Sequence, residues 1–241
     1  MPLTFAHPAA VLPFSRKNKY IHFSALVLGS MAPDFEYFLR GQPVGEVGHT
    51  LSGFFYFNLP LVAIIYLIYH SFIHQPLVNH LPAFLQDFKK EKVNASHQLN
   101  LIVFIYSALF GMLTHVIWDS FTHQNGFMVT KAPILAYAYN IFGFDISLYK
   151  ILQHGSTLIG ITIIIGYIYY RAKKSPKNAN IRIKQKVIFW SLLIFLAIVF
   201  ATLWILFDYV SVMNYGIIVV RIIDSTFVSL LIVSLIFSGK Y

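Results

Sequence analysis

The chain has 241 residues, of which 57% are hydrophobic and only 11% are charged, and its mean hydropathy is +0.66. In soluble domains roughly a quarter of the residues are charged. This composition therefore excludes an ordinary soluble domain and predicts an integral membrane protein. The net charge of +9 does not indicate nucleic acid as a partner, because the basic residues cluster between apolar segments, as the positive-inside rule describes. The chain has no cysteine. This excludes disulfides and thiolate metal sites and leaves imidazole and carboxylate as the strong metal ligands.

The N-terminal region predicts short helices rather than a clear membrane span. His7 precedes Pro8, a residue suited to the first turn of a helix. The apolar segment 20–32 is shorter than the roughly 20 residues that cross a bilayer. The segment 20–39 is therefore either a strained first span or a re-entrant or interfacial piece, and we favour the second.

Five later segments are apolar and long enough to cross a membrane. They cover about 54–72, 99–121, 151–170, 187–207 and 216–237. The predicted fold class is all-α, a multi-pass transmembrane helical bundle of five or six spans with an N-terminal interfacial or re-entrant helical segment. We expect one membrane domain over 1–241, with a metal-site half over 1–160 and the C-terminal spans over 161–241.

Two basic loops predict the orientation of the spans. The denser loop holds Arg171, Lys173, Lys174, Lys177, Arg182, Lys184 and Lys186, and the other holds Lys89, Lys90 and Lys92. The positive-inside rule places both loops in the cytoplasm, which also makes the C-terminus cytoplasmic.

The densest functional signal lies at the end of the segment 99–121. His115, Asp119 and His123 recur every fourth residue, so on a helix their side chains share one face. Ionisable residues in a membrane helix are costly unless they pair, coordinate an ion or face water. We therefore interpret the stripe as a metal or catalytic site. The alternative is a polar patch that packs helix against helix through hydrogen bonds.

The predicted orientation brings further residues to the same outer surface. Counting the spans places His115, Asp119, His123, His154, His49 and Asp34 there. His7 joins this set if the segment 20–39 is re-entrant, and it lies on the opposite side if that segment spans.

A site of imidazoles and carboxylates without thiols suits zinc first, and also manganese or iron. A bound divalent metal lowers the pKa of its water toward about 7, which suits phosphoester hydrolysis. Asp119, between two histidines, is placed to bridge two metals, and Asp34 and Glu36 are candidates for a ligand or a general base. In the last span, Arg221 and Asp224 are three residues apart, and we expect them to form an ion pair.

Several motifs resemble a bacterial membrane family, domain-of-unknown-function family 4184. They are the opening Met-Pro-Leu-Thr-Phe-Ala-His-Pro, the run Gly-Ser-Met-Ala-Pro-Asp-Phe-Glu-Tyr-Phe, His49-Thr50, Thr-His-Val-Ile-Trp-Asp-Ser-Phe-Thr-His and Gln-His-Gly-Ser. The resemblance covers most of the chain to about residue 160 and implies a bacterial inner-membrane protein.

The chain is also distantly similar to membrane-bound metal-dependent hydrolases related to inner-membrane proteins of the SOS regulon. These are similar in ligand order to zinc-dependent phospholipase C and the fungal single-strand nucleases. The resemblance implies the ligands His7, Asp34, His49, His115 and Asp119, continued by His123 and His154, around one to three ions. Leu158 stands where that order has a glutamate, and Met1 stands where it has a tryptophan. These departures favour one or two ions over three.

The sequence thus predicts a membrane-embedded, metal-dependent hydrolase. The expected substrate is a phosphoester or a phospholipid-like molecule at the outer face, with membrane lipid as partner and Asp34, Glu36 and Asp119 as catalytic candidates. One alternative is a transporter in which the histidines bind a translocated metal ion or relay protons. Another is a non-catalytic scaffold that a metal stabilises.

Overall fold

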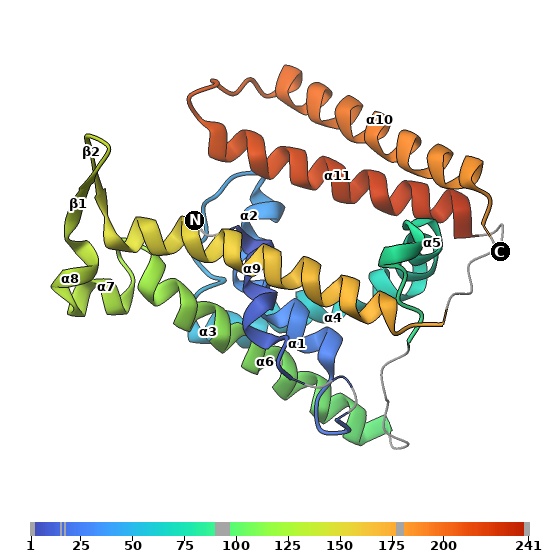
Figure 1. The fold of residues 1–241 in the computed structure, drawn as a ribbon, viewed down its shortest axis with the longest axis horizontal. Helices are drawn as coiled ribbons and strands as arrows, with labels where there is room; N and C mark the ends of the chain where they lie inside the picture. The colour runs from blue at the N-terminus through green and yellow to red at the C-terminus, as the bar shows by residue number, and fades with distance from the viewer. Residues whose placement is uncertain (1–2, 15, 17, 90–96, 177–180, 239–241) are drawn as a thin grey trace. The chain divides into compact units, whose positions relative to one another are not determined.

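Over the residues that the structure describes, the protein folds into helices and one small hairpin (Figure 1). The computed structural model describes residues 3–14, 16, 18–89, 97–176 and 181–238. Within these residues, five apolar helical segments are long enough to cross a membrane. They are Leu51–His80, Gln98–Thr122, Leu148–Lys173, Ile183–Phe207 and Tyr215–Ser238. The prediction of an all-α, multi-pass membrane fold is confirmed. Met1, Lys17, Lys90, Lys92 and Lys177 lie outside the described residues.

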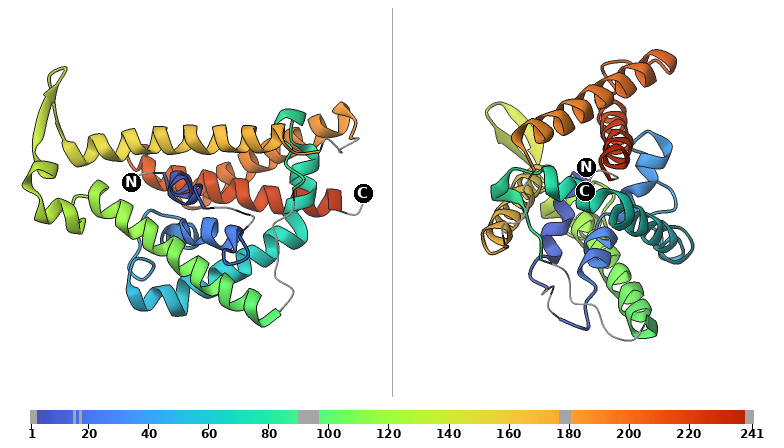
Figure 2. Two further views of the ribbon diagram at one scale, coloured as in Figure 1. Left: turned by 60° about the horizontal axis from the view of Figure 1, so that its bottom comes forward. Right: turned by 90° about the vertical axis from the view of Figure 1, so that its right-hand side faces the viewer.

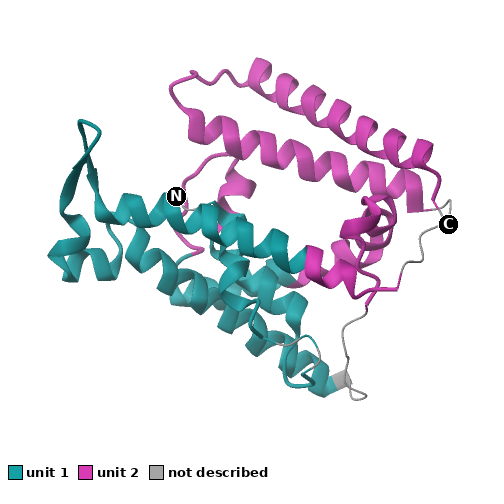
Figure 3. Ribbon diagram, in the orientation of Figure 1, with its two compact units in different colours: residues 1–33, 49–62, 91–168 teal, residues 34–48, 63–90, 169–241 magenta. Residues whose placement is uncertain are grey.

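Two compact units make up the chain, and each draws on several separate stretches (Figure 3). Unit 1 comprises residues 1–33, 49–62 and 91–168, and unit 2 comprises residues 34–48, 63–90 and 169–241. The division of one membrane domain at residue 160 remains a prediction.

Unit 1 is built around the long helix α6 (His97–Thr122), which contacts two N-terminal helices, η1 (Thr4–Val11) and α1 (Phe23–Gly29). At seven residues, α1 extends only about 10 Å, so it does not cross a bilayer of about 30 Å. The remaining elements are the start of η2 (Ala32–Asp34), α3 (Leu51–Gly53), η3 (Phe54–Asn58), the start of α4 (Leu59–Ile68), α7 (Phe127–Lys131), α8 (Pro133–Ala136) and most of α9 (Leu148–Lys173).

The backbones of α1 and α6 approach so closely that glycine is required on both helices. A Cβ atom on Gly29 would lie 2.2 Å from the carbonyl oxygen of Ala108. A Cβ atom on Gly111 would lie 2.4 Å from the carbonyl oxygen of Leu26. Small residues of this kind let membrane helices pack backbone against backbone. The crossing fixes the end of α1 against the middle of α6, one turn before His115.

A hairpin of two short strands precedes α9 (Figure 2). Strands β1 (Ala138–Ile141) and β2 (Phe144–Ser147) pair antiparallel, with Ala138 opposite Ser147. The turn places Phe142 and Gly143 at φ values of 51° and 86°, the combination that tight hairpin turns require. Phe142 is almost fully exposed, so the hairpin tip is an accessible position outside the spans.

Unit 2 contains the antiparallel pair α10 (Ile183–Phe207) and α11 (Tyr215–Ser238), which run side by side (Figures 1 and 2). Phe189, Leu193, Val233 and Phe237 form its buried core. The unit also holds α2 (Phe35–Arg40), η4 (Tyr69–Ile73), α5 (His74–His80) and η5 (Ala83–Leu85).

The predicted partner of Arg221 is wrong. Its guanidinium pairs with the carboxylate of Asp208 and donates a hydrogen bond to the Asp208 carbonyl oxygen at 2.6 Å, rather than pairing with Asp224. Arg221 also lies over the ring of Trp204, 5.2 Å from the ring centroid. Asp208, which directly follows α10, is thus the counter-ion of Arg221 on α11.

Candidate metal centre

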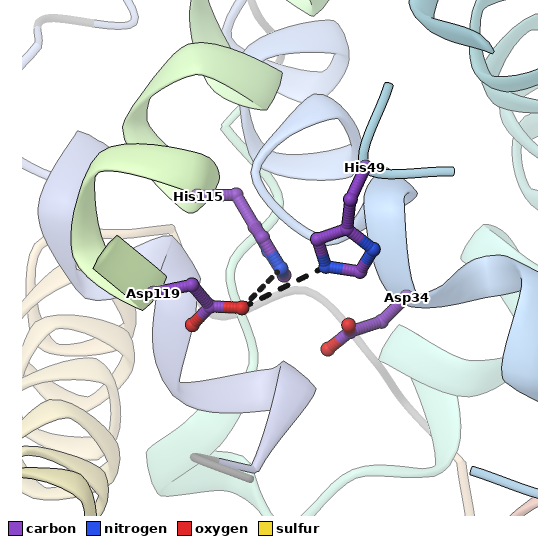
Figure 4. Close-up of side chains that lie close together, drawn as sticks. All are labelled: Asp34, His49, His115 and Asp119. Carbon is purple, nitrogen blue, oxygen red and sulfur yellow. Dashed lines mark ion pairs between the residues drawn. The ribbon is translucent and has the colours of Figure 1, made fainter. Parts of the chain in front are cut away.

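Asp119 is the centre of a cluster of imidazoles in unit 1 (Figure 4). Its Oδ2 lies 3.2 Å from His115 Nε2 and 3.7 Å from His49 Nε2. Its Oδ1 lies 3.5 Å from both His7 Nε2 and His123 Nδ1. Ligands about 2.0–2.1 Å from a tetrahedral metal are about 3.3 Å apart. The contacts of Asp119 with these nitrogens are therefore close to the separation of two ligands that share one ion.

The tautomer of His115 follows from its other ring nitrogen. Nδ1 lies 2.8 Å from the carbonyl oxygen of Ser30. A carbonyl can only accept, so Nδ1 carries the proton and donates it. In a neutral imidazole, Nε2 then presents a lone pair to the Asp119 carboxylate 3.2 Å away. Two acceptors at this distance repel unless a cation or a proton lies between them. A histidine with one nitrogen held by a backbone carbonyl is also the usual arrangement of a metal ligand.

His7 reaches the cluster because η1 packs on α9. Leu3 donates its amide hydrogen to Thr157 Oγ1 at 3.2 Å. A Cβ atom on Gly160 would lie 3.0 Å from the carbonyl oxygen of Ala6, so the backbone of η1 lies directly on α9. The buried ring of His7 stacks on that of His115, with their centroids 3.8 Å apart and an angle of 22° between the planes. The structure thus brings His7 into the cluster, as expected if the segment 20–39 does not span.

His49 and His123 form the more accessible side of the cluster. The side chains of His49 and His123 are 32% and 29% exposed, against 1% for His7 and 0% for His115. Thr50 caps α3 by accepting a hydrogen bond from the Gly53 amide at 3.0 Å, which fixes the chain directly after His49. His123 follows the last residue of α6, and its amide hydrogen bonds to the Asp119 carbonyl oxygen at 3.1 Å.

Asp34 supplies a second carboxylate. It ends η2 and is the first residue of unit 2 in the chain, directly after Pro33 of unit 1. One ligand atom from each of Asp34, His49, His115 and Asp119 lies within 4.8 Å of the others (Figure 4). The group could hold a metal ion, and it comprises nitrogen and oxygen donors only.

Charge balance is compatible with a divalent cation and not with four protonated histidines. Four imidazoles approach Asp119, and protonation of all four would leave a large positive charge in a largely buried place. Two stacked imidazolium rings such as His7 and His115 would also repel each other. Asp119 Oδ1 is itself buried and accepts no hydrogen bond from the described residues. A divalent ion with neutral imidazoles and two carboxylates is electrically neutral, so the residues fit a metal.

Glu36 is not available as a ligand or a general base, which corrects the expectation for this residue. Its Oε1 accepts hydrogen bonds from the Arg40 guanidinium at 2.7 and 2.9 Å. Its Oε2 accepts three more, from the amides of Glu46, Val47 and Gly48 at 2.9–3.0 Å. Glu36 therefore fastens the loop that ends directly before His49 in the sequence.

The structure does not bring His154 into the cluster either. The positions of α9 that face η1 are Thr157 and Gly160, and Gln153, one turn earlier on the same face, is buried. His154 is exposed, because one residue along a helix turns the side chain by about 100°. The motif Gln-His-Gly-Ser thus contributes its glutamine, not its histidine, to the buried face.

Sequence reasoning missed the carbonyl of Ser30, which sets the tautomer of His115. A backbone group has no signature of its own in the sequence. The available signal was indirect, in Gly29 directly before Ser30 and Gly111 one turn before His115. Two small residues at these positions are typical of helices that touch through their backbones.

The fold and the cluster define a class, a multi-pass membrane protein with a candidate site for a metal ion at the end of a span. The chain belongs to the family described as a domain of unknown function, DUF4184, whose profile matches residues 1–235. No curated protein and no solved structure matches the chain.

Proposed function

We propose that the protein is a metal-dependent hydrolase of phosphoester or phospholipid-like substrates. The observation that carries the proposal is the facing pair of His115 Nε2 and Asp119 Oδ2, 3.2 Å apart, with the other nitrogen of His115 held by the Ser30 carbonyl. His7, His49 and Asp34 complete the proposed ligand set, with His123 at its edge. The proposal also draws on the expectation, made from the sequence alone, that the motif order resembles that of membrane-bound metal-dependent hydrolases.

The donor set suits zinc, and also manganese or iron, because it offers imidazole and carboxylate without sulfur. When bound, such an ion supplies Lewis acidity, which polarises a phosphoryl oxygen and acidifies coordinated water. In hydrolysis, the oxygen of water forms a bond to phosphorus while the bond from phosphorus to the leaving oxygen breaks. His123, at the edge of the ligand set, is the proposed group that takes the proton from the water, and the leaving oxygen takes a proton from solvent.

The unequal exposure of the cluster favours hydrolysis over a purely structural metal. A structural zinc site is closed by four protein ligands, whereas a catalytic site keeps a position for water or substrate. His7 and His115 close the inner side, while His49 and His123 are about one-third exposed. Substrate can therefore approach from the side of these two histidines.

The same stripe of α6 favours hydrolysis over transport. Transport through the bundle requires polar groups that continue along the span. The two preceding positions of the stripe are Gly111, packed against the backbone of α1, and Ser107, which accepts a hydrogen bond from the His22 amide at 3.0 Å. Ionisable groups thus end at His115 on this helix face. We further propose that the cluster lies at the outer face of a bacterial inner membrane.

The test is metal analysis of the protein purified in detergent, followed by hydrolysis of bis(p-nitrophenyl) phosphate. We expect at least one divalent ion per chain and hydrolysis that a chelator abolishes and added zinc restores. Asp119→Asn should lose both the ion and the activity. Asp145→Asn, which changes an exposed aspartate of the β hairpin, is the matched control and should keep both. Wild-type protein that binds metal but does not hydrolyse bis(p-nitrophenyl) phosphate would contradict the proposed hydrolase activity. Wild-type protein that binds no metal would contradict the proposed metal centre.

A further inference from the structure

An apolar groove of about 500 Å³ lies beside the candidate metal centre in unit 1. Its walls include Ile117, Trp118 and Phe121 from α6, Leu152 from α9 and Ala10 from η1. The groove therefore lies between two membrane-spanning helices and the short helix that carries His7.

The polar groups that line the groove are already hydrogen-bonded within the protein. Thr114 and Thr122 donate their hydroxyl hydrogens to the carbonyl oxygens of Gly111 and Trp118, at 2.7 and 3.3 Å. Ser156 accepts a hydrogen bond from the Trp118 indole at 3.1 Å. The surface left for a ligand is hydrocarbon, so the groove selects an apolar chain over a polar molecule.

The groove and the metal centre share a wall. The indole of Trp118 lines the groove and lies edge-on to the ring of His7, with 5.6 Å between their centroids. Thr122 lines the groove and directly precedes His123. One molecule can therefore place an apolar chain in the groove and a polar head at the cluster.

The surroundings decide which apolar chain is available. Ile117, Phe121 and Leu152 are exposed on the flanks of membrane spans, where the medium is the hydrocarbon of the bilayer. We propose that the groove holds an acyl chain of a phosphate-bearing membrane lipid whose headgroup lies at the metal centre. This inference rests on the proposed function and names its substrate class: the phosphoester that is cleaved belongs to a lipid.

The first test is independent of catalysis. The protein is placed in vesicles of phosphatidylethanolamine and phosphatidylglycerol that contain phosphatidylglycerol with a diazirine on one acyl chain, and the crosslinked peptides are mapped by mass spectrometry. We expect crosslinks concentrated at 117–121 and at Leu152. Equal labelling of all lipid-facing helices would overturn the proposal. So would exclusion of the lipid from the groove by a second copy of the chain.

The second test uses two tryptophan variants of α9. Leu152→Trp fills the groove, and Ile168→Trp adds the same bulk at a position of similar exposure, 40% against 37%, away from it. Excluding two methylene groups from an apolar site costs roughly tenfold in binding. We therefore expect Leu152→Trp to reduce kcat/KM for long-chain phosphatidylglycerol by about tenfold and to leave bis(p-nitrophenyl) phosphate unaffected.

The outcomes separate the two proposals. Wild-type protein inactive on both substrates refutes the proposed function, while the crosslinks still test the groove. Protein active on both substrates, with Leu152→Trp and Ile168→Trp behaving alike, refutes the lipid chain in the groove and leaves the hydrolase intact.

Discussion

His115 connects the fold to the chemistry at the scale of a single residue. Its Nδ1 donates to the Ser30 carbonyl, and its Nε2 faces the Asp119 carboxylate. A neutral ring in this position presents a metal ligand, and a protonated ring presents only an ion pair. The stacked ring of His7, 3.8 Å away, disfavours a state in which both rings are protonated, because two adjacent positive rings repel.

Glu36 gives a stability prediction. Burial raises the pKa of this carboxyl, but the amides of Gly48, Val47 and Glu46 and the Arg40 guanidinium outweigh burial and lower the pKa to about 2, from 4.5. The folded state therefore gains stability above about pH 4.5 and loses it as the pH falls toward 2. Glu36→Gln should lower the free energy of unfolding at neutral pH by up to about 3 kcal/mol and flatten its decline in acid.

Thermal unfolding followed by circular dichroism in detergent, from pH 7 downward, measures this effect. Glu46→Gln is the matched control, since Glu46 contacts the same Arg40 at 3.4 Å but is 70% exposed. An exposed ion pair contributes little. Equal losses in the two variants would show that Glu36 does not fasten the loop.

Single residues also show which parts of the candidate site could be predicted from the sequence. The spacing of His115, Asp119 and His123 predicted a shared face because helix geometry alone places every fourth residue together. Glu36 looked equally suited to bind a metal, but besides Arg40 its partners are backbone amides ten to twelve residues away. Such partners depend on how the loop folds, which no local pattern reveals.

At the scale of elements, the contact between α1 and α6 positions the candidate centre. Gly29 and Gly111 allow the two backbones to touch, and the chain then delivers the Ser30 carbonyl to His115. The five spans could be predicted from hydropathy, because length and apolar composition suffice to cross a bilayer. The position of α1 could not, since a seven-residue helix acquires its place only from packing.

Gly29→Ala tests this contact. The new methyl group would lie 2.2 Å from the Ala108 carbonyl oxygen. We therefore expect the free energy of unfolding to fall by about 1–3 kcal/mol. The metal content should fall as well, because Ser30 moves with α1. The matched control is Gly166→Ala on α9, where a Cβ atom meets nothing within 4 Å. It should be neutral or stabilise by up to about 1 kcal/mol.

Both variants are compared by melting temperature in detergent and by metal analysis. A wild-type melting temperature for Gly29→Ala would contradict the close crossing of α1 and α6.

At the scale of the whole molecule, the orientation of the spans decides on which side of the membrane the cluster lies. The positive-inside rule predicts that the basic loop after α9 lies in the cytoplasm. The hairpin before α9 then lies outside, together with the end of α6 that carries Asp119. The chain lacks cysteine, which makes single-cysteine labelling unambiguous.

Phe142→Cys at the hairpin tip and Lys174→Cys after α9 test this orientation with a membrane-impermeant maleimide on intact cells. Both positions are exposed. We expect labelling at position 142 from outside, and labelling at position 174 only after the membrane is opened. The reverse pattern would place the cluster in the cytoplasm and refute the proposed outer-face site.

The most direct measurement of the metal centre is 15N NMR of histidine-labelled protein in detergent at neutral pH, with zinc and after chelation. His115→Gln identifies the His115 signals. We predict a protonated Nδ1 and an Nε2 without a proton, whose chemical shift changes when zinc binds. A His115 ring protonated on both nitrogens and indifferent to zinc would show that Asp119 is balanced by an ion pair and not by a metal.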